Sequence, residues 1–350
     1  MLWTADSLTA ASPDLTYSLP GPAASVAASA DGKVIWIVCY IARPGSPPNS
    51  LGPFDSVVYT FDPSNRRLTE ILKAAGVATV TVAPMGSKAI IVLPDEHSNG
   101  KALLYDGSDQ NAGLPLDFSF LNPIFVLWNS DGRRLYSYGG STIQADAWNI
   151  LAMTSIDSRT VSKRRLAIPT ESAYVCSRTG HVFVGLPGLD RTGHLERTRA
   201  AEYDADLNLI GRSRFSAGGF SATCRYVATP SSFHGPIPWR ITETASGREV
   251  SCFDFTGGET GKEEFEFESW NPKRDEILLR TRYNAAGAGT DLQVFELSHK
   301  AVIETFRNFR GANFDGQAAW SADGLSLLLA RGRSLRIHPL ALPAAAKTSH

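Results

Sequence analysis

One pattern of apolar and polar positions recurs along most of the chain. An apolar stretch, a short polar turn and a second apolar stretch occur together seven times. The turns centre on Gly32, Gly86, Gly132, Gly180, Cys224, Arg274 and Gly324, so successive steps are 54, 46, 48, 44, 50 and 50 residues. The apolar runs are short and rich in branched and aromatic residues, which predicts strands. Asp or Asn with Gly predicts tight hairpin turns, and the turns at Cys224 and Arg274 are expected to be of another type.

A second pattern follows most of these copies. It consists of a strand, a polar turn and another strand, as in VYTFDPSNRRLTEIL, AEYDADLNLIGRSRF and LQVFELSHKAVIETF. Each repeat therefore predicts four strands, and repeats of about 40–50 residues with four strands are typical of propeller blades. The predicted fold is all-β, a single seven-bladed β-propeller with four-stranded antiparallel blades.

The last repeat supplies only three strands, Gln317–Trp320, Leu325–Ala330 and Leu335–Leu340. The N-terminal segment Leu15–Leu19 precedes the first hairpin and can supply the missing outer strand. Pairing the two ends of the chain in one blade closes the ring and leaves only short outer edges exposed. We therefore expect one domain over residues 1–345, followed by a disordered tail at 346–350.

Three of the hairpins resemble a known motif. Trp320-Ser321-Ala322-Asp323-Gly324, Trp128-Asn129-Ser130-Asp131-Gly132 and, more loosely, Ser29-Ala30-Asp31-Gly32 are similar to the W-S-x-D-G hairpin of the WD40-like, TolB-type repeat family. The resemblance covers nearly the whole chain and implies the propeller architecture. Such relatives include peptide and partner binders, lyases, lactonases and gating domains of oligopeptidases, so the resemblance selects no single activity.

Composition narrows the class of partner. The 350 residues are 43% hydrophobic and 20% charged, with a formal net charge of -1, so no overall field favours nucleic acid or an anionic membrane. No apolar run is long enough to span a bilayer, and the N-terminus lacks a signal-peptide pattern. The compartment stays open, since a periplasmic or secreted location is compatible with a signal already removed.

Without a C-x-x-C pair, the four cysteines are expected to be small buried residues. We expect a monomer.

The long connections gather on one side of the predicted ring. With the strands of each blade named A to D from the axis outward, the A–B and C–D turns are tight and open on one side. The B–C connections open on the other side. Six of them are long: Ile41–Asp55, Pro94–Gly100, Gly139–Ala147, Pro187–Arg199, Pro230–Pro238 and Tyr283–Thr290. Because loops on a rigid scaffold commonly carry function, we expect a ligand or partner site on the B–C side, at the mouth of the central channel.

Two neighbouring B–C connections carry groups suited to metal or acid–base chemistry. Asp190, His194 and His234 could together bind a divalent metal ion, and His194, His234 and Glu196 could act as catalytic acids or bases. The alternative is that these are solvated polar loops. No cofactor is predicted beyond this possible metal.

Other side chains suit an anionic or aromatic ligand. An arginine group near the last two blades consists of Arg282, Arg307, Arg310, Arg331 and Arg333, of which the first three are the candidate ligand contacts. Guanidinium groups bind carboxylates and phosphates well. Trp148 and Trp239 stand where long connections enter strand C, and could stack on a ligand or simply cover the blade edge.

The run Glu264-Phe265-Glu266-Phe267-Glu268 falls on an innermost strand, so alternation directs three carboxylates to one face. Folding the hairpin about Pro272–Arg274 places Glu266 opposite Arg280 and Glu264 opposite Arg282. Buried carboxylates need partners, so we predict a cross-strand Glu–Arg ladder.

The leading hypothesis is a non-enzymatic module that binds a protein, a peptide or a small anionic ligand on the B–C side. The rival is a propeller enzyme, a lyase or a metal-dependent hydrolase, with its site at the channel mouth. A third possibility is a structural domain of a larger chain. No hydrolase motif of the G-x-S-x-G or H-E-x-x-H type occurs, and GGETGKE departs from the phosphate-loop spacing.

Overall fold

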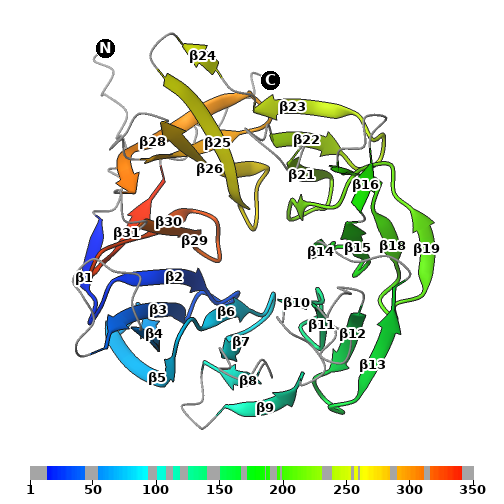
Figure 1. Cartoon of the computed structure of the whole chain (residues 1–350). Coiled ribbons are helices and arrows are strands. Elements are labelled where there is room, and N and C mark those ends of the chain that lie inside the picture. Colours follow the sequence, from blue (N-terminus) through cyan, green and yellow to red (C-terminus); the bar gives the residue numbers. More distant parts are fainter. Residues whose placement is uncertain are drawn as a thin grey trace, which may run out of the picture.

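The structure is a computed structural model. It describes residues 14–43, 54–93, 101–107, 113–118, 125–139, 150–166, 172–185, 187–189, 195–197, 199–230, 239–253, 256–258, 261–283, 290–310 and 316–340. This part of the chain contains strands and turns and no helix, and hence no helix that could cross a membrane. Seven sheets, blades I to VII, stand around a central axis (Figure 1).

Each blade is an antiparallel sheet whose strands follow one another along the chain from the axis outward, except that the outermost strand of blade VII comes from the N-terminus. Blade I contains β2 (Ala23–Ala28), β3 (Ile35–Ala42), β4 (Phe54–Asp62) and β5 (Arg67–Ala75). Blade II contains β6 (Thr79–Val82), β7 (Lys88–Leu93), β8 (Lys101–Asp106) and β9 (Leu114–Asp117). Blade III contains β10 (Phe125–Trp128), β11 (Arg134–Gly139), β12 (Ile150–Ser155) and β13 (Val161–Arg165). Blades IV and V contain β14 (Ser172–Val175), β15 (Val182–Gly185), β18 (Ala201–Tyr203) and β19 (Leu209–Arg212); and β20 (Gly219–Phe220), β21 (Tyr226–Pro230), β22 (Trp239–Glu243) and β23 (Glu249–Phe253). Blades VI and VII contain β25 (Gly261–Trp270), β26 (Glu276–Tyr283), β27 (Thr290–Glu296) and β28 (Ala301–Arg310); and β29 (Gly316–Trp320), β30 (Ser326–Arg331), β31 (Ser334–Pro339) and β1 (Leu15–Ser18). A hairpin of β16 (Pro187–Leu189) and β17 (Leu195–Arg197) lies between β15 and β18, and β24 (Thr256–Gly258) pairs with β25.

The hydrophobic core of the described chain lies between blades rather than inside any one of them. Each of the seven junctions between neighbouring blades holds one buried apolar cluster. Strand β3 shows the cause, because alternate residues of a strand point to opposite faces. Ile35 and Ile37 pack toward blade VII, whereas Trp36 and Val38 pack toward blade II. A strand buried on both faces therefore needs an unbroken apolar run.

The tryptophans at the ends of two inner strands link neighbouring blades. The indole N–H of Trp128 donates to the carbonyl oxygen of Thr81 at 3.0 Å, and that of Trp270 donates to Gly219 at 2.7 Å. Each bond reaches back to the inner strand of the preceding blade. Tryptophan suits this place because its ring fills the junction while its N–H satisfies a backbone acceptor.

The two ends of the described chain share blade VII. Strand β1 pairs with β31 in antiparallel register, with Leu15 opposite Ile337 and Ser18 opposite Ser334. Below this pairing, the guanidinium of Arg333 donates to the carbonyl oxygens of Leu19, at 3.3 Å, and Pro20, at 2.5 Å. A buried apolar cluster joins blades VII and I beside these contacts.

The A–B turns rely on residues with positive φ. Gly32 and Gly324 both have a φ of 70°, and Cys224 has a φ of 56°. The expectation that Cys224 marks a different turn was wrong. Its backbone N–H donates to the carbonyl oxygen of Ser221, just as the N–H of Gly324 donates to the carbonyl oxygen of Ser321. Arg274 is not among the described residues with positive φ, and its N–H donates to the Asn271 side chain at 3.2 Å, so that turn does differ.

Two turn glycines with positive φ, Gly86 and Gly324, differ in what an added Cβ atom would meet. A Cβ at Gly86 would have nothing within 4 Å, whereas a Cβ at Gly324 would lie 2.1 Å from Oδ1 of the buried Asn271. We expect Gly86→Ala to lower the free energy of unfolding by about 1–2 kcal/mol, the cost of a left-handed backbone. Gly324→Ala should cost clearly more, since Asn271 also donates to the Gly324 carbonyl at 2.9 Å. Urea denaturation of both variants measures this, and equal losses would contradict it.

Candidate binding groove

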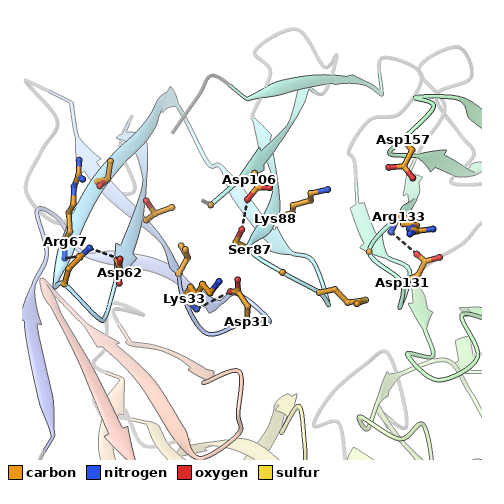
Figure 2. A pocket seen from close by; sticks show the side chains of 18 residues that line it. Asp31, Lys33, Asp62, Arg67, Ser87, Lys88, Asp106, Asp131, Arg133 and Asp157 are labelled. Carbon is orange, nitrogen blue, oxygen red and sulfur yellow. Dashed lines mark hydrogen bonds between the residues drawn. The ribbon is translucent and has the colours of Figure 1, made fainter. Parts of the chain in front are cut away.

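A groove opens on the turn side of the ring, where the A–B and C–D turns lie, and runs across blades I, II and III (Figure 2). Its volume is about 770 Å³, within the range of about 300–1,000 Å³ that ligand sites occupy. The charged residues of its lining are Asp31, Lys33, Asp62, Arg67, Lys88, Asp106, Asp131, Arg133 and Asp157. Most ligand pockets are largely apolar, so this lining favours a charged occupant.

Most of the aspartates are engaged by their own turns. Asp31 accepts hydrogen bonds from the Ser29 hydroxyl at 2.7 Å and from a backbone N–H at 3.2 Å. Asp106, at the end of β8, instead accepts the hydroxyl of Ser87 from the turn before β7 at 2.6 Å, and Asp131 accepts a backbone N–H within its own turn at 2.8 Å. Aspartate at these places stabilises the turn by satisfying backbone donors.

Asp62 follows the same rule, with an electrostatic consequence. Hydrogen bonds from the Ser64 hydroxyl and backbone N–H lower the pKa of the Asp62 carboxyl from its ordinary value. Asn65 also donates to this carboxylate, at 2.8 Å. The Asp62 carboxylate therefore stays ionised at neutral pH and keeps its hydrogen bonds within the turn.

The four cationic residues of the groove differ from its aspartates in their contacts. Lys33 and Arg133 directly follow the turn glycines of blades I and III, Lys88 begins β7, and Arg67 begins β5. Lys33, Arg67 and Arg133 are exposed and Lys88 is half-buried. Within the described ranges, no ion pair joins any of these four side chains to a carboxylate. Among the described residues, the groove thus presents four cations without an ionic partner, while most of its carboxylates accept hydrogen bonds.

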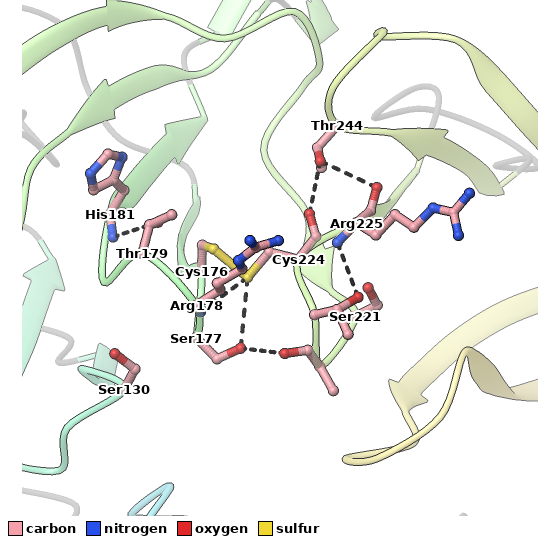
Figure 3. The surroundings of a disulfide bond; sticks show 12 residues. Ser130, Cys176, Ser177, Arg178, Thr179, His181, Ser221, Cys224, Arg225 and Thr244 are labelled. Carbon is pink, nitrogen blue, oxygen red and sulfur yellow. Dashed lines mark hydrogen bonds between the residues drawn. A yellow bond between two sulfur atoms is a disulfide. The ribbon is translucent and has the colours of Figure 1, made fainter.

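The turn side also holds a disulfide bond between Cys176 and Cys224, which joins blades IV and V (Figure 3). Their Cα atoms are 5.7 Å apart. The expectation of four unpaired buried cysteines was therefore wrong. Cys39 is free and buried, as expected, but Cys252 is exposed.

This pairing matches a contact that is seen at two other junctions between blades. The first residue of one A–B turn reaches the glycine position of the turn in the next blade. Asn271 does so by hydrogen bonding to Gly324, and the Asn129 side chain lies beside Gly180. Cys176 and Cys224 occupy the equivalent pair of positions. Their spacing of 48 residues is one blade repeat, which was the available signal.

The predicted register of the Glu–Arg ladder in blade VI is confirmed, and so is the contact between Glu266 and Arg280, whereas a side-chain contact between Glu264 and Arg282 stays a prediction. Glu266 pairs in register with Arg280, and Glu264 pairs with Arg282. The Arg280 side chain is only 7% exposed and contacts Glu266 at 3.8 Å and Glu268 at 2.7 Å. The shorter contact to Glu268 follows from a bulge between Phe267 and Ser269, which shifts the register there.

The candidate metal and acid–base residues fall largely beyond what the structure describes. Asp190, His194 and His234 lie outside the described residues, and for Glu196 only its position on β17 is described. Within the described ranges, no group of three or more His, Cys, Asp or Glu side chains could hold a metal ion.

The arginine group is only partly brought together. Arg282 and Arg310 both pair with Thr290, from β26 and β28, so the three residues form one row across the sheet of blade VI. Arg307 is exposed on β28. Arg333, from the same predicted group, instead binds the backbone of the N-terminal segment.

The two tryptophans proposed to stack on a ligand have different outcomes. Trp148 lies outside the described residues. Trp239 is half-buried at the start of β22, and its ring centroid is 5.2 Å from that of Phe267 in blade VI. This contact shows that Trp239 covers a junction between blades, and a role in ligand stacking stays a prediction.

Sequence reasoning missed the groove on the turn side. It treated the D-G turns as structural and placed the site among the long connections. A signal was present, because the turn glycines Gly32, Gly86 and Gly132 are each followed within two residues by a basic residue. Blades VI and VII lack such a residue after their turns, since Asp275 and Leu325 follow there.

Comparison with known proteins identifies the architecture. No protein-family model matches the sequence, and no curated protein is significantly similar to it. Among solved structures, a chain of a mitotic checkpoint complex superposes with a TM-score of 0.56 at 12% identity, covering 98% of this chain and 100% of that one. The β-propeller domain of the Trilobed protease from Pyrococcus furiosus gives 0.60 at 10% identity, over 95% and 99%. The C-terminal WD40 domain of Sif2 gives 0.52 at 11%, over 94% and 99%. At these identities the likeness establishes only the β-propeller fold. The seven sheets of the described chain make it a seven-bladed β-propeller.

Proposed function

We propose that this protein is a non-enzymatic interaction module that binds a charged segment of another protein along the groove of blades I to III. The observation that carries this proposal is the set of four cations, Lys33, Arg67, Lys88 and Arg133, that line one groove without an ionic partner in the described chain. One of the similar structures is a chain of a multiprotein complex, which supports a propeller of this kind as an assembly surface.

The chemistry of the groove specifies the kind of segment. Glutamate or aspartate side chains of the partner would accept hydrogen bonds from the two guanidinium and two ammonium groups. The engaged aspartates of the turns would repel a second carboxylate placed beside them, so a segment with spaced acidic residues fits better than a continuous acidic run. Because these cations are largely exposed, binding should weaken as salt increases.

The B–C side is proposed as a second contact surface. Six of its seven connections are long, and Arg282, Arg307, Arg310, Trp148 and Trp239 are the candidate contacts there. The enzyme hypothesis depends on Asp190, His194, Glu196 and His234. No observation on the described residues favours it.

The test compares peptide binding to the groove with peptide binding to the B–C side. Peptides selected from a random display library on the wild-type protein would be labelled, and their affinities measured by fluorescence anisotropy. We expect Lys88→Glu/Arg133→Glu to weaken the selected peptides by about tenfold or more, since two attractive charges become repulsive. Arg212→Glu is the matched control, because Arg212 is an exposed cation on β19 that does not line the groove.

Three outcomes separate the possibilities. Loss of affinity in the groove variant but not in Arg212→Glu supports the proposal. Loss only in Arg307→Glu moves the site to the B–C side and overturns the assignment of the groove. Failure to select any peptide that binds more tightly to wild type than to the groove variant also overturns it.

A further inference from the structure

Three parts of the chain that are distant in sequence meet at His338, on β31 in blade VII. Its Nδ1 lies 2.7 Å from Oδ1 of Asp14, which directly precedes β1. Its Nε2 lies 2.5 Å from Oε1 of Glu304, on the outermost strand of blade VI. Arg336, two residues before His338, forms an ion pair with Asp14. The His338 side chain is only 17% exposed, whereas the Asp14 side chain is 35% exposed, so the contact to Asp14 is open to solvent on one side.

Only one protonation state of His338 can satisfy both carboxylate contacts at once. A carboxylate only accepts hydrogen bonds, so each ring nitrogen must carry a proton to bond to one. Neutral imidazole carries a single N–H and can therefore satisfy either Asp14 or Glu304, but not both. The imidazolium satisfies both, and it balances Asp14 and Glu304 against His338 and Arg336 with no net charge.

Loss of the proton has a defined consequence at Nδ1. The Arg336 guanidinium is 3.2 Å from Nδ1, so it can donate to that nitrogen when the nitrogen is unprotonated. The bond from Nε2 to Glu304 then persists, whereas the bond between His338 and Asp14 is lost. Asp14 keeps only Arg336, and the cluster carries a net negative charge.

We propose that attachment of the N-terminal strand β1 to blade VII is proton-linked through His338. The groups that face this histidine are Asp14 from the N-terminal segment, Glu304 and the Phe306 ring edge from blade VI, and Arg336 from its own strand. At mildly acidic pH, β1 is held more tightly in the sheet of blade VII than at higher pH.

The N-terminal strand is suited to such control because it is short and lies at the edge of its blade. It has only four residues, three of them exposed, on the outer edge of its blade. An edge strand with little buried apolar surface opens more readily than the core strands. The contact to His338 adds to the pairing with β31 and to the packing of Tyr17 against Phe61 in holding this segment.

The electrostatics of Asp14 agree with this geometry. Burial raises the pKa of the Asp14 carboxyl, hydrogen bonds from Arg336 and His338 lower it, and the net result is a pKa below its ordinary value. Asp14 thus stays ionised at neutral pH and can accept a hydrogen bond from Nδ1 of His338.

Hydrogen exchange measured by mass spectrometry tests the proposal on the full-length protein. Protection of a peptide covering residues 14–19 would be compared at about pH 5.5 and about pH 8, which bracket histidine titration, after correction for intrinsic exchange. We expect about tenfold greater protection at the lower pH, the effect of one charge-assisted hydrogen bond. His338→Gln should abolish this difference. His299→Gln is the control, because His299 contacts Glu296 in an exposed turn of blade VI, away from β1.

A second variant guards against misfolding of blade VII in His338→Gln. Asp14→Asn leaves the histidine and the apolar core intact, and it should also remove most of the pH dependence at residues 14–19. Equal protection of the wild type at both pH values would overturn the proposal. So would an unchanged pH dependence in Asp14→Asn.

Discussion

Replacing Arg280 with methionine is expected to lower the free energy of unfolding by about 3 kcal/mol, as for other buried ion pairs that lose one partner. Arg280 is almost fully buried on β26 and contacts both Glu266 and Glu268. Methionine fills much of the same volume but leaves the two carboxylates near each other without the shared cation. We take the lower end of the usual range because the Glu266 side chain is 41% exposed. Urea denaturation followed by tryptophan fluorescence measures the loss.

Two further variants identify the cause of that loss. Arg280→Met/Glu266→Gln/Glu268→Gln removes the charges together and should recover at least half of the stability, because no like charges then face each other. Arg212→Met removes an exposed arginine and should change stability by no more than about 0.5 kcal/mol. If the triple variant is as unstable as Arg280→Met, packing rather than charge explains the effect.

Removal of the disulfide is expected to have a comparable effect. The bond between Cys176 and Cys224 closes a loop with a sequence separation of 48 residues. Chain entropy for a loop of that size predicts that Cys176→Ser/Cys224→Ser loses about 4 kcal/mol of unfolding free energy. Wild-type protein unfolded in urea with a reductant should match this variant.

The backbone at position 224 provides a matched comparison. Cys224 has a φ of 56°, which glycine adopts without strain. Cys176→Ser/Cys224→Gly should therefore be more stable than the double serine variant by about 1 kcal/mol, although both lack the disulfide. A Cys176→Ser/Cys224→Gly variant that is less stable than Cys176→Ser/Cys224→Ser would contradict this, because glycine would then relieve no backbone strain at position 224.

The sequence predicted those features that each blade determines by itself. Unbroken apolar runs such as Ile35–Tyr40 report burial on both faces, and turn glycines report positive φ, so strands and hairpins follow from local chemistry. The Glu266–Arg280 register was predictable for the same reason, because both residues belong to one hairpin.

Features that arise between blades were not predicted. The disulfide joins turns of neighbouring blades, and the glycine-like turn at Cys224 is part of the same contact. The groove forms only when the turns of three blades are placed side by side, so no single segment carries its signature. His338 likewise meets Asp14 and Glu304 only through closure of the ring.

The most direct test of the proposed binding function is to locate a bound peptide on the ring. A selected peptide carrying a photo-reactive group would be cross-linked to the wild-type protein, and the modified residues identified by mass spectrometry. The proposal predicts cross-links within Asp31–Val34, Asp62–Thr69, Met85–Lys88 and Asp131–Arg133, on the turn side of blades I to III. Cross-links confined to the B–C connections would contradict it.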